Sequence, residues 1–341
     1  MDFDRRTLLS AGAAVPFAGS ARSQDASLEV GPYEVATVEQ MDLVDTVGGR
    51  TIQTRAIYPA KPGRYPGIVF SHGFGGSLKT FPNTGKIWAS HGYVVLHPTH
   101  IDSLGFPSTK VEPADAEVMR RFRETRATPD PATLAAFVQV LDHPYFIASR
   151  LEDVNCLLRL WKTGGSGMDE TVRARTDTSK LGMSGHSFGG YTTLVCAGAR
   201  LDPPVDKPVP SGFAGFLMMS GQGPGRMGLN EGSFSGVTAP LMATTGTRDF
   251  GAANETPPWR LRPYDLSPSG NKYAVVVEGF RHSDFDPAAG DPVMGVRGAV
   301  LHRFQINFWD TVLKKDPAGF RRLDARAAGS QAADPVWIRR R

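Results

Sequence analysis

Short, mostly apolar runs recur along the chain, separated by stretches with helical spacing. The runs lie at residues 67–71, 93–96, 180–184, 216–219, 241–244 and 273–277. Runs of this length without polar alternation are typical of strands buried on both faces. Helices are expected between them, including one around 151–161, where apolar residues recur every three or four positions, and a last one over 296–313. Strands alternating with helices predict an α/β fold with a mainly parallel central sheet and helices on both faces.

Two segments depart from this rhythm. Residues 34–58 alternate apolar and polar positions on either side of Gly48 and Gly49, which predicts an antiparallel hairpin at the sheet edge. Residues 101–150 are charged in their first half and contain Thr128-Pro129-Asp130-Pro131, which would stop one helix and start another. We expect this segment to be an insertion, or lid, over the carboxyl edge of the sheet. A long surface connection is the alternative.

The N-terminus has the pattern of an export signal. Arg5 and Arg6 precede a weakly apolar run of small residues that is too short to span a bilayer and is interrupted by Pro16. Residues 1–23 therefore resemble a bacterial twin-arginine signal, which predicts a periplasmic or secreted protein. An N-terminal helix with two surface arginines is the alternative. The expected division is a signal at 1–23, one folded domain at 24–315 and a basic C-terminal tail at 316–341.

Composition excludes several classes of protein. Of the 341 residues, 40% are apolar and 21% are charged, which is ordinary for a globular protein and excludes disorder of the whole chain. No apolar stretch is long enough to predict a stable membrane span. The net charge is +4, but residues 314–341 alone carry eight basic groups against three acidic ones. The body of the chain is thus slightly acidic, which argues against nucleic acid as a partner.

A pentapeptide between a predicted strand and a predicted helix supplies a candidate nucleophile. Gly185-His186-Ser187-Phe188-Gly189 has the Gly-x-Ser-x-Gly spacing. A serine nucleophile must stand clear of the chain on a sharp turn, where neighbouring side chains would clash. The following helix directs its first N–H groups at the reaction centre. We therefore expect Ser187 to be the nucleophile; a glycine-rich packing turn with an inert serine is the alternative.

A base and an acid are needed to activate the serine, and they follow it in the order acid, then histidine. His282 comes directly after the run at 273–277, whereas the competing His302 falls inside the last predicted helix. Asp249 comes directly after the run at 241–244 and is the predicted acid. The weaker candidates for the acid, which do not follow a strand end before the histidine, are Asp265, Asp284 and Asp286.

The glycine-rich segment 71–76 follows the first buried run and supplies a candidate oxyanion loop. The backbone N–H groups of Phe188 and Phe74 are the expected donors to a developing oxyanion. Their rings should crowd the mouth of the site and favour a short acyl group. Further residues expected at this substrate pocket are His100, Leu104, Phe106, Phe122 and Trp259.

A rival pattern, His97-x-x-His100-x-Asp102, has two histidines and a carboxylate of the kind that bind zinc. His97 precedes a proline in a predicted loop, and no further cluster of strong ligands accompanies it. We expect no metal and no cofactor. His100 and Asp102 are instead expected to line the site or to satisfy backbone groups of the loop.

Three segments carry a family resemblance: residues 65–76, 89–95 and 185–190. They resemble the α/β-hydrolase superfamily, and within it the branch of platelet-activating-factor acetylhydrolases and dienelactone hydrolases, over residues 50–315. The resemblance implies the α/β-hydrolase fold. The chain departs from the acetylhydrolases in having Met219-Ser220-Gly221 where they carry the acid, so that Asp249 is placed as in bacterial cutinase-like polyester hydrolases. It departs from dienelactone hydrolases in having Ser187 where they have cysteine.

These features together predict a serine hydrolase that cleaves carboxylic esters, with short acyl groups, through an acyl-enzyme. The expected partner is a small-molecule ester. An exported amidase or peptidase and a polyester hydrolase on the same scaffold are alternatives, as is a non-catalytic binding module. The pattern leaves the oligomeric state open.

Overall fold

The computed structural model describes residues 30–46, 49–104, 111–125, 130–251, 255–288, 291, 294–331 and 334–341. The predicted signal at 1–23 and the pocket candidate Phe106 lie outside these residues, so both stay predictions. Gly48, at the turn of the predicted hairpin, also lies outside them.

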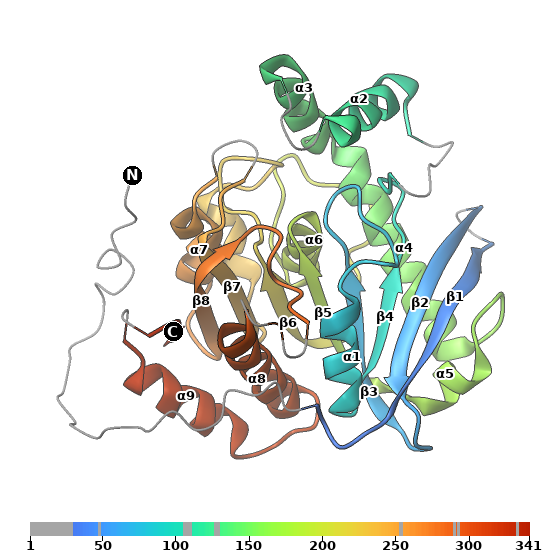
Figure 1. Ribbon diagram of the computed structural model, residues 1–341. Helices are drawn as coiled ribbons and strands as arrows, with labels where there is room; N and C mark the ends of the chain where they lie inside the picture. Colours follow the sequence, from blue (N-terminus) through green and yellow to red (C-terminus); the bar gives the residue numbers. More distant parts are fainter. Residues whose placement is uncertain are drawn as a thin grey trace.

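Within the described residues, one nine-stranded sheet runs through the molecule (Figure 1) in the order β1-β2-β4-β3-β5-β6-β7-β8-β9. The strands are β1 Val35–Asp45, β2 Arg50–Pro59, β3 Tyr65–Ser71, β4 Val94–Pro98, β5 Thr176–His186, β6 Phe213–Met219, β7 Leu241–Arg248, β8 Lys272–Arg281 and β9 Val336–Arg340. In this spatial order, the six strands β4, β3, β5, β6, β7 and β8 pair in parallel with their neighbours. The strands β1 and β2 at one end and β9 at the other join in antiparallel pairs. The mainly parallel sheet predicted from the apolar runs is confirmed, as is the hairpin of β1 and β2.

Helices cover both faces of this sheet, as predicted. The helices α1 Pro82–Ser90, α8 Gly295–Val312 and α9 Gly319–Gly329 contribute to the apolar core on one face. The helices α4 Pro144–Thr163, α6 Phe188–Cys196 and α7 Pro257–Leu266 contribute to the core on the other. The short α5 Glu170–Arg175 precedes β5, and a 3₁₀ helix, η2 Glu231–Gly236, precedes β7.

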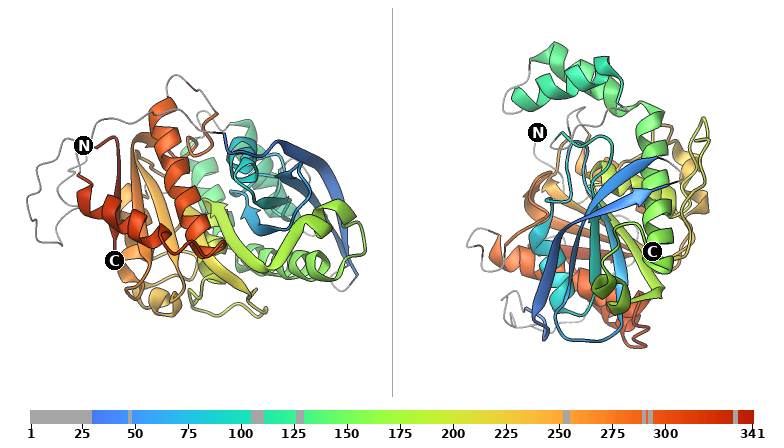
Figure 2. Two further views of the ribbon diagram at one scale, coloured as in Figure 1. Left: turned by 90° about the horizontal axis from the view of Figure 1, so that it is seen from below. Right: turned by 90° about the vertical axis from the view of Figure 1, so that its right-hand side faces the viewer.

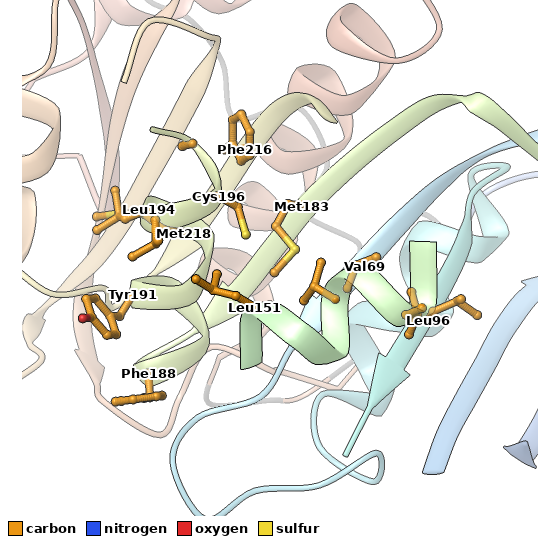
Figure 3. Packing of buried hydrophobic residues seen from close by; sticks show 14 of the residues in the cluster. Val69, Leu96, Leu151, Met183, Phe188, Tyr191, Leu194, Cys196, Phe216 and Met218 are labelled. Carbon is orange, nitrogen blue, oxygen red and sulfur yellow. The ribbon is translucent and has the colours of Figure 1, made fainter. Parts of the chain in front are cut away.

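The central strands are apolar without alternation because both of their faces are buried. In β3, Ile68 and Phe70 belong to the core on one side of the sheet, and Val69 belongs to the core on the other. Figure 3 shows the second core, where Leu151 of α4 and Leu194 of α6 lie among side chains of the sheet. The apolar burial on both faces fixes the position of the strand ends that carry the candidate site.

Two helices of the predicted insertion, α2 Pro113–Glu124 and α3 Pro131–Leu141, stand beyond the end of the sheet, as the green helices of Figure 2 show. Phe137 of α3 contacts Phe74, which follows β3, with ring centroids 5.6 Å apart. The insertion therefore lies over the carboxyl edge of the sheet. Its second boundary falls earlier than predicted, because α4 already begins at Pro144. Whether α2 and α3 move as a lid stays a prediction.

Residues 316–341, predicted as a basic C-terminal tail, contain a helix and a strand. Residues 319–329 form α9, and β9 pairs with β8 at the edge of the sheet. The reason is an apolar run between the charges: Trp337 and Ile338 are buried, and they cover what would otherwise be an open strand edge. The arginines that suggested a tail lie beside acidic partners, since Arg340 Nε is 2.9 Å from an oxygen of Asp324.

Candidate active site

Ser187 occupies a strained turn between β5 and α6. Its backbone has φ 56° and ψ −117°, a left-handed conformation that side chains rarely adopt. The turn is possible because its neighbours are glycines: a Cβ on Gly189 would lie 1.8 Å from the carbonyl oxygen of Ser71, and one on Gly185 would lie 2.3 Å from that of Gly189. The spacing Gly-x-Ser-x-Gly is thus a steric requirement of this turn, and it presents the serine hydroxyl outward.

The structure brings Ser187, His282 and Asp249 into one hydrogen-bonded chain. The Nε2 atom of His282 lies 2.9 Å from Oγ of Ser187, and its Nδ1 atom lies 2.8 Å from Oδ1 of Asp249. The Asp249 side chain is fully buried, whereas that of His282 is 35% exposed. The carboxylate is therefore shielded from water, and the imidazole can be reached from solvent.

Sheet topology explains this convergence. Ser187 follows β5, Asp249 follows β7 and His282 follows β8, and these strands run parallel with β6 between β5 and β7. Parallel strands end at one edge of a sheet, so residues distant in sequence meet there. Asp249 and His282 are 33 positions apart in the sequence, and α7 and β8, one crossover unit, lie between them.

Two further groups contact the Asp249 carboxylate. The hydroxyl of Thr245 donates to Oδ2 at 2.9 Å, and the Arg260 guanidinium lies 3.1 Å from Oδ1. Burial would raise the pKa of Asp249, but the hydrogen bond with His282 and the charge of Arg260 outweigh it and lower the pKa to about 2. A buried, ionised acid can orient His282 and stabilise its protonated form.

Ser220 is part of this arrangement and was missed by the sequence analysis as a site residue. Its Oγ donates to Oδ1 of Asp249 at 2.8 Å and lies 2.6 Å from Nδ1 of His282. Its backbone has φ 51°, at the end of β6. One feature of the sequence could have identified Ser220 as a site residue: it directly follows a predicted strand, and the next predicted strand is the one that Asp249 follows.

His186, the variable residue before the serine, was also missed. It is buried, and burial lowers its pKa to about 3, so it is neutral at physiological pH. Its Nε2 donates to the carbonyl oxygen of His282 at 2.7 Å, and the two rings lie 4.8 Å apart. His186 thereby supports the loop that carries His282.

The predicted oxyanion loop lies against Ser187. A Cβ on Gly73 would be 3.4 Å from Cβ of Ser187, so the loop backbone passes directly beside the serine. Phe188 is the first residue of α6, and the first N–H groups of a helix have no acceptor within it. The structure thus places Phe74 and Phe188 on two sides of Ser187, and their role as oxyanion donors stays a prediction.

Aromatic rings gather around Phe74. It meets Phe188 edge to face with centroids 5.4 Å apart, and Phe146 at 4.9 Å. Phe137, which also contacts Phe74, is stacked on Phe122 of α2 at 3.6 Å. The insertion therefore adds Phe137 and Phe122 to the ring cluster around Phe74, and a contact of Phe122 with substrate stays a prediction.

The other pocket candidates have different positions. Trp259 is half-buried at the start of α7 and donates from its indole to the carbonyl of Pro224 at 2.7 Å. Leu104 packs on Gly75 of the oxyanion loop. The prediction that His100 lines the pocket is corrected by its position. The side chain is buried behind the loop, where it is hydrogen-bonded to Ser71 and Asp153.

The competing histidine and carboxylates lie elsewhere. His302 is buried in α8 beside Thr84. Asp265 pairs with Arg339. Asp284 accepts from the backbone of Arg281, and Asp286 accepts from that of Thr84 at 2.7 Å.

Among the described residues, no group of three or more His, Cys, Asp or Glu side chains is arranged to hold a metal ion. His97 packs on Phe70 with ring centroids 5.2 Å apart, and Asp102 pairs with Arg150. The three residues of the rival zinc pattern therefore do not converge.

A second Ser-His-Asp set lies near the first. Oγ of Ser71 is 2.9 Å from Nε2 of His100, whose Nδ1 is 2.8 Å from Oδ2 of Asp153. All three are buried, and Ser71 is the last residue of β3, without the positive φ of Ser187. The Ser71 hydroxyl also accepts a hydrogen bond from Arg150 at 3.0 Å. Without access to solvent, this set cannot receive a substrate.

The sheet order, with a serine, an aspartate and a histidine that each follow a parallel strand, is that of the α/β-hydrolase fold. Residues 40–127 match the family described as platelet-activating factor acetylhydrolase, isoform II. This part of the chain is similar to that family, which confirms the predicted resemblance for residues 40–127; Ser187, Asp249 and His282 lie outside the match.

Curated relatives are cutinases of Thermobifida. The chain is 28% identical over 195 residues to a cutinase of Thermobifida fusca (strain YX), covering 56% of this chain and 49% of the relative. It is 28% identical over 190 residues to cutinase 1 of Thermobifida cellulosilytica, covering 55% of each. It is 30% identical over 195 residues to cutinase est1 of Thermobifida alba, covering 56% of this chain and 50% of the relative. The match spans about half the length of each of these relatives.

No helix in the described part of the chain combines the length and apolar character needed to cross a membrane.

Proposed function

We propose that the protein hydrolyses carboxylic esters through an acyl-enzyme formed on Ser187. The observation that carries this proposal is the strained, outward-facing Ser187 with its hydroxyl 2.9 Å from a histidine that a buried carboxylate orients. Strain of this kind is kept where it serves a function. The similarity to acetylhydrolases and cutinases supports ester substrates.

In the proposed reaction, Oγ of Ser187 attacks the ester carbonyl while Nε2 of His282 takes its proton. The backbone N–H groups of Phe74 and Phe188 bind the oxyanion of the tetrahedral intermediate. His282 then gives its proton to the departing alcohol, which leaves the acyl group on Ser187. A water molecule, deprotonated by His282, releases the acid and regenerates the serine. Asp249 accepts a hydrogen bond from Nδ1 throughout and stabilises the imidazolium.

A small substrate fits the site better than a polymer. Phe137 and Phe122 of the insertion extend the ring cluster around Phe74, and we infer that a polymer chain at Ser187 would have to pass these rings. The cutinase relatives keep a polyester as the second candidate substrate. We further infer that residues 1–23 direct the protein out of the cytoplasm, on the twin-arginine pattern.

Replacing Ser187 by alanine tests the proposal directly. We expect Ser187→Ala to lose labelling by a fluorophosphonate probe and to lower kcat for p-nitrophenyl butyrate by at least about 10⁴-fold, because the Ser187 hydroxyl is the group that Nε2 of His282 contacts. The far-ultraviolet circular dichroism spectrum of this variant should be unchanged. The control variant is Ser283→Ala, which removes an exposed hydroxyl beside His282 and should keep full activity. Retained turnover in Ser187→Ala would rule out the mechanism.

The acid is tested by an isosteric change. We expect Asp249→Asn to lower kcat by about 10⁴-fold, because an amide at this position favours the wrong tautomer of His282. Asp265→Asn removes a carboxylate of α7 that pairs with Arg339 and should leave kcat within about twofold. Steady-state kinetics on an ester substrate measure both. The reverse pattern would move the acid to Asp265.

Acyl-chain preference tests the crowded pocket. Each methylene that cannot be buried forfeits about 0.8 kcal/mol, or roughly fourfold in kcat/KM. We expect acetyl and butyryl esters to exceed octanoyl and longer esters in kcat/KM, measured from two to twelve acyl carbons. A cavity of about 640 Å³ is lined in part by Leu104 and Met119. A maximum at eight or more carbons would indicate that chains reach it, and would refute the crowded pocket.

A further inference from the structure

Arg150 stands behind the candidate oxyanion loop with no exposed surface. It belongs to α4, and its guanidinium makes a two-point contact with Asp102, with Nε 2.8 Å from Oδ1 and Nη2 2.7 Å from Oδ2. Both side chains are completely buried. Arginine and carboxylate in this geometry form a rigid planar unit.

This unit holds the oxyanion loop at both ends. The Nη1 atom of Arg150 donates to the carbonyl oxygen of His72 at 2.6 Å. Oδ2 of Asp102 accepts from the backbone N–H of Gly75 at 3.0 Å. Gly73 and Phe74, the two residues between these anchors, are the ones that pass beside Ser187. The orientation of the Phe74 amide therefore depends on a pair of side chains that does not touch the substrate.

The same guanidinium contacts the other side of the site. Its central carbon lies 4.7 Å from the centre of the Phe188 ring, and Nη1 also donates to Ser71 Oγ. Ser71 is in turn bonded to His100, which Asp153 orients, so the buried second Ser-His-Asp set serves as a support for Arg150. One side chain thus links both residues proposed to supply the oxyanion donors.

The electrostatics keep Asp102 ionised. Burial opposes the charge on Asp102, but the attraction and hydrogen bonds of Arg150 hold the pKa of Asp102 below its usual value. Burial, assisted by the charge of Arg150, lowers the pKa of His72 to about 4, so His72 is neutral and adds no competing charge. Its Nε2 accepts from the backbone of His100, which leaves Nδ1 to donate to the carbonyl of Gly73 at 2.6 Å.

We propose that Arg150, with Asp102, is a positioning residue that sets the geometry of the oxyanion hole. Donors act on a transition state only if they are already aimed at the developing charge. The loop contains Gly73, Gly75 and Gly76, so its own sequence gives it little rigidity. The buried pair supplies that rigidity. This inference rests on the proposed esterase mechanism and goes beyond it by naming what orients the oxyanion donors.

The test replaces Arg150 by lysine, which keeps the charge and loses the two-point contact. We expect Arg150→Lys to lower kcat by about 10- to 100-fold, which is less than the loss caused by removing one oxyanion donor altogether. KM should change by less than about twofold. The inhibition constant of a trifluoromethyl ketone, which forms a tetrahedral adduct with the serine, should rise by the same factor as kcat/KM falls.

The ketone separates positioning from folding. A merely structural role would reduce the number of sites found by active-site titration and leave the inhibition constant of the remaining sites unchanged. Arg159→Lys is the matched control, since Arg159 lies on the same helix and is also ion-paired, with Asp45, but its side chain is 43% exposed. It should match the wild type in kcat and in inhibition constant.

Asp102→Asn is the second variant and keeps the inference testable if Arg150→Lys fails to fold. It keeps the side-chain shape and removes the charge, and we expect the inhibition constant to rise by about tenfold. If the wild type is active but the folded variants have unchanged inhibition constants, the proposed role of Arg150 is overturned and the proposed function is not. A wild type that neither hydrolyses esters nor binds the ketone would overturn the proposed function, and the role of Arg150 with it.

Discussion

The close approach of the Ser187 turn to the end of β3 is the constraint on which the site depends. The backbone of Ser71 comes so near to α6 that only glycine fits at position 189, and Ser187 is left with a positive φ. Such a conformation costs on the order of 1 to 3 kcal/mol. It persists because β5 and α6 are buried within the larger of the two cores, which holds the turn in place. The nucleophile, the first N–H groups of α6 and the oxyanion loop are thereby fixed relative to one another.

Two buried arginines complete the site from opposite sides. Arg150 holds the loop after β3, as argued above, and Arg260 holds the loops after β6 and β7. The Arg260 guanidinium donates to the carbonyl oxygens of Ser220 and Gly221, each at 3.1 Å, and to the backbone oxygen of Asp249. Each arginine has a buried carboxylate beside it, so neither leaves an uncompensated charge in the interior. The strand-end loops are therefore held by ionic groups rather than by their own backbone regularity.

The sequence predicted the features that follow from local pattern. Apolar runs gave the sheet, and strand-end positions selected Ser187, His282 and Asp249, which the structure brings together. The buried position of Arg150 could not be predicted from the sequence. An arginine in an amphipathic helix is expected at the surface, and its partner Asp102 belongs to a loop that is distant in the sequence. Ser220 was passed over because its hydroxyl acts only between two groups from other strands. The C-terminal strand was not predicted because the count of charges in residues 316–341 drew attention away from Trp337. Trp337 is buried only because β9 pairs with β8 at the edge of the sheet.

The central claim is that the accessible Ser187, and not the buried Ser71, forms the acyl-enzyme. Rapid acid quenching of the wild-type protein during turnover of p-nitrophenyl butyrate, followed by peptide mass spectrometry, tests it most directly. The account predicts a butyryl group on the peptide that contains Ser187 and an unmodified Ser71. A butyryl group on Ser71, or hydrolysis with no modified serine on either peptide, would contradict it.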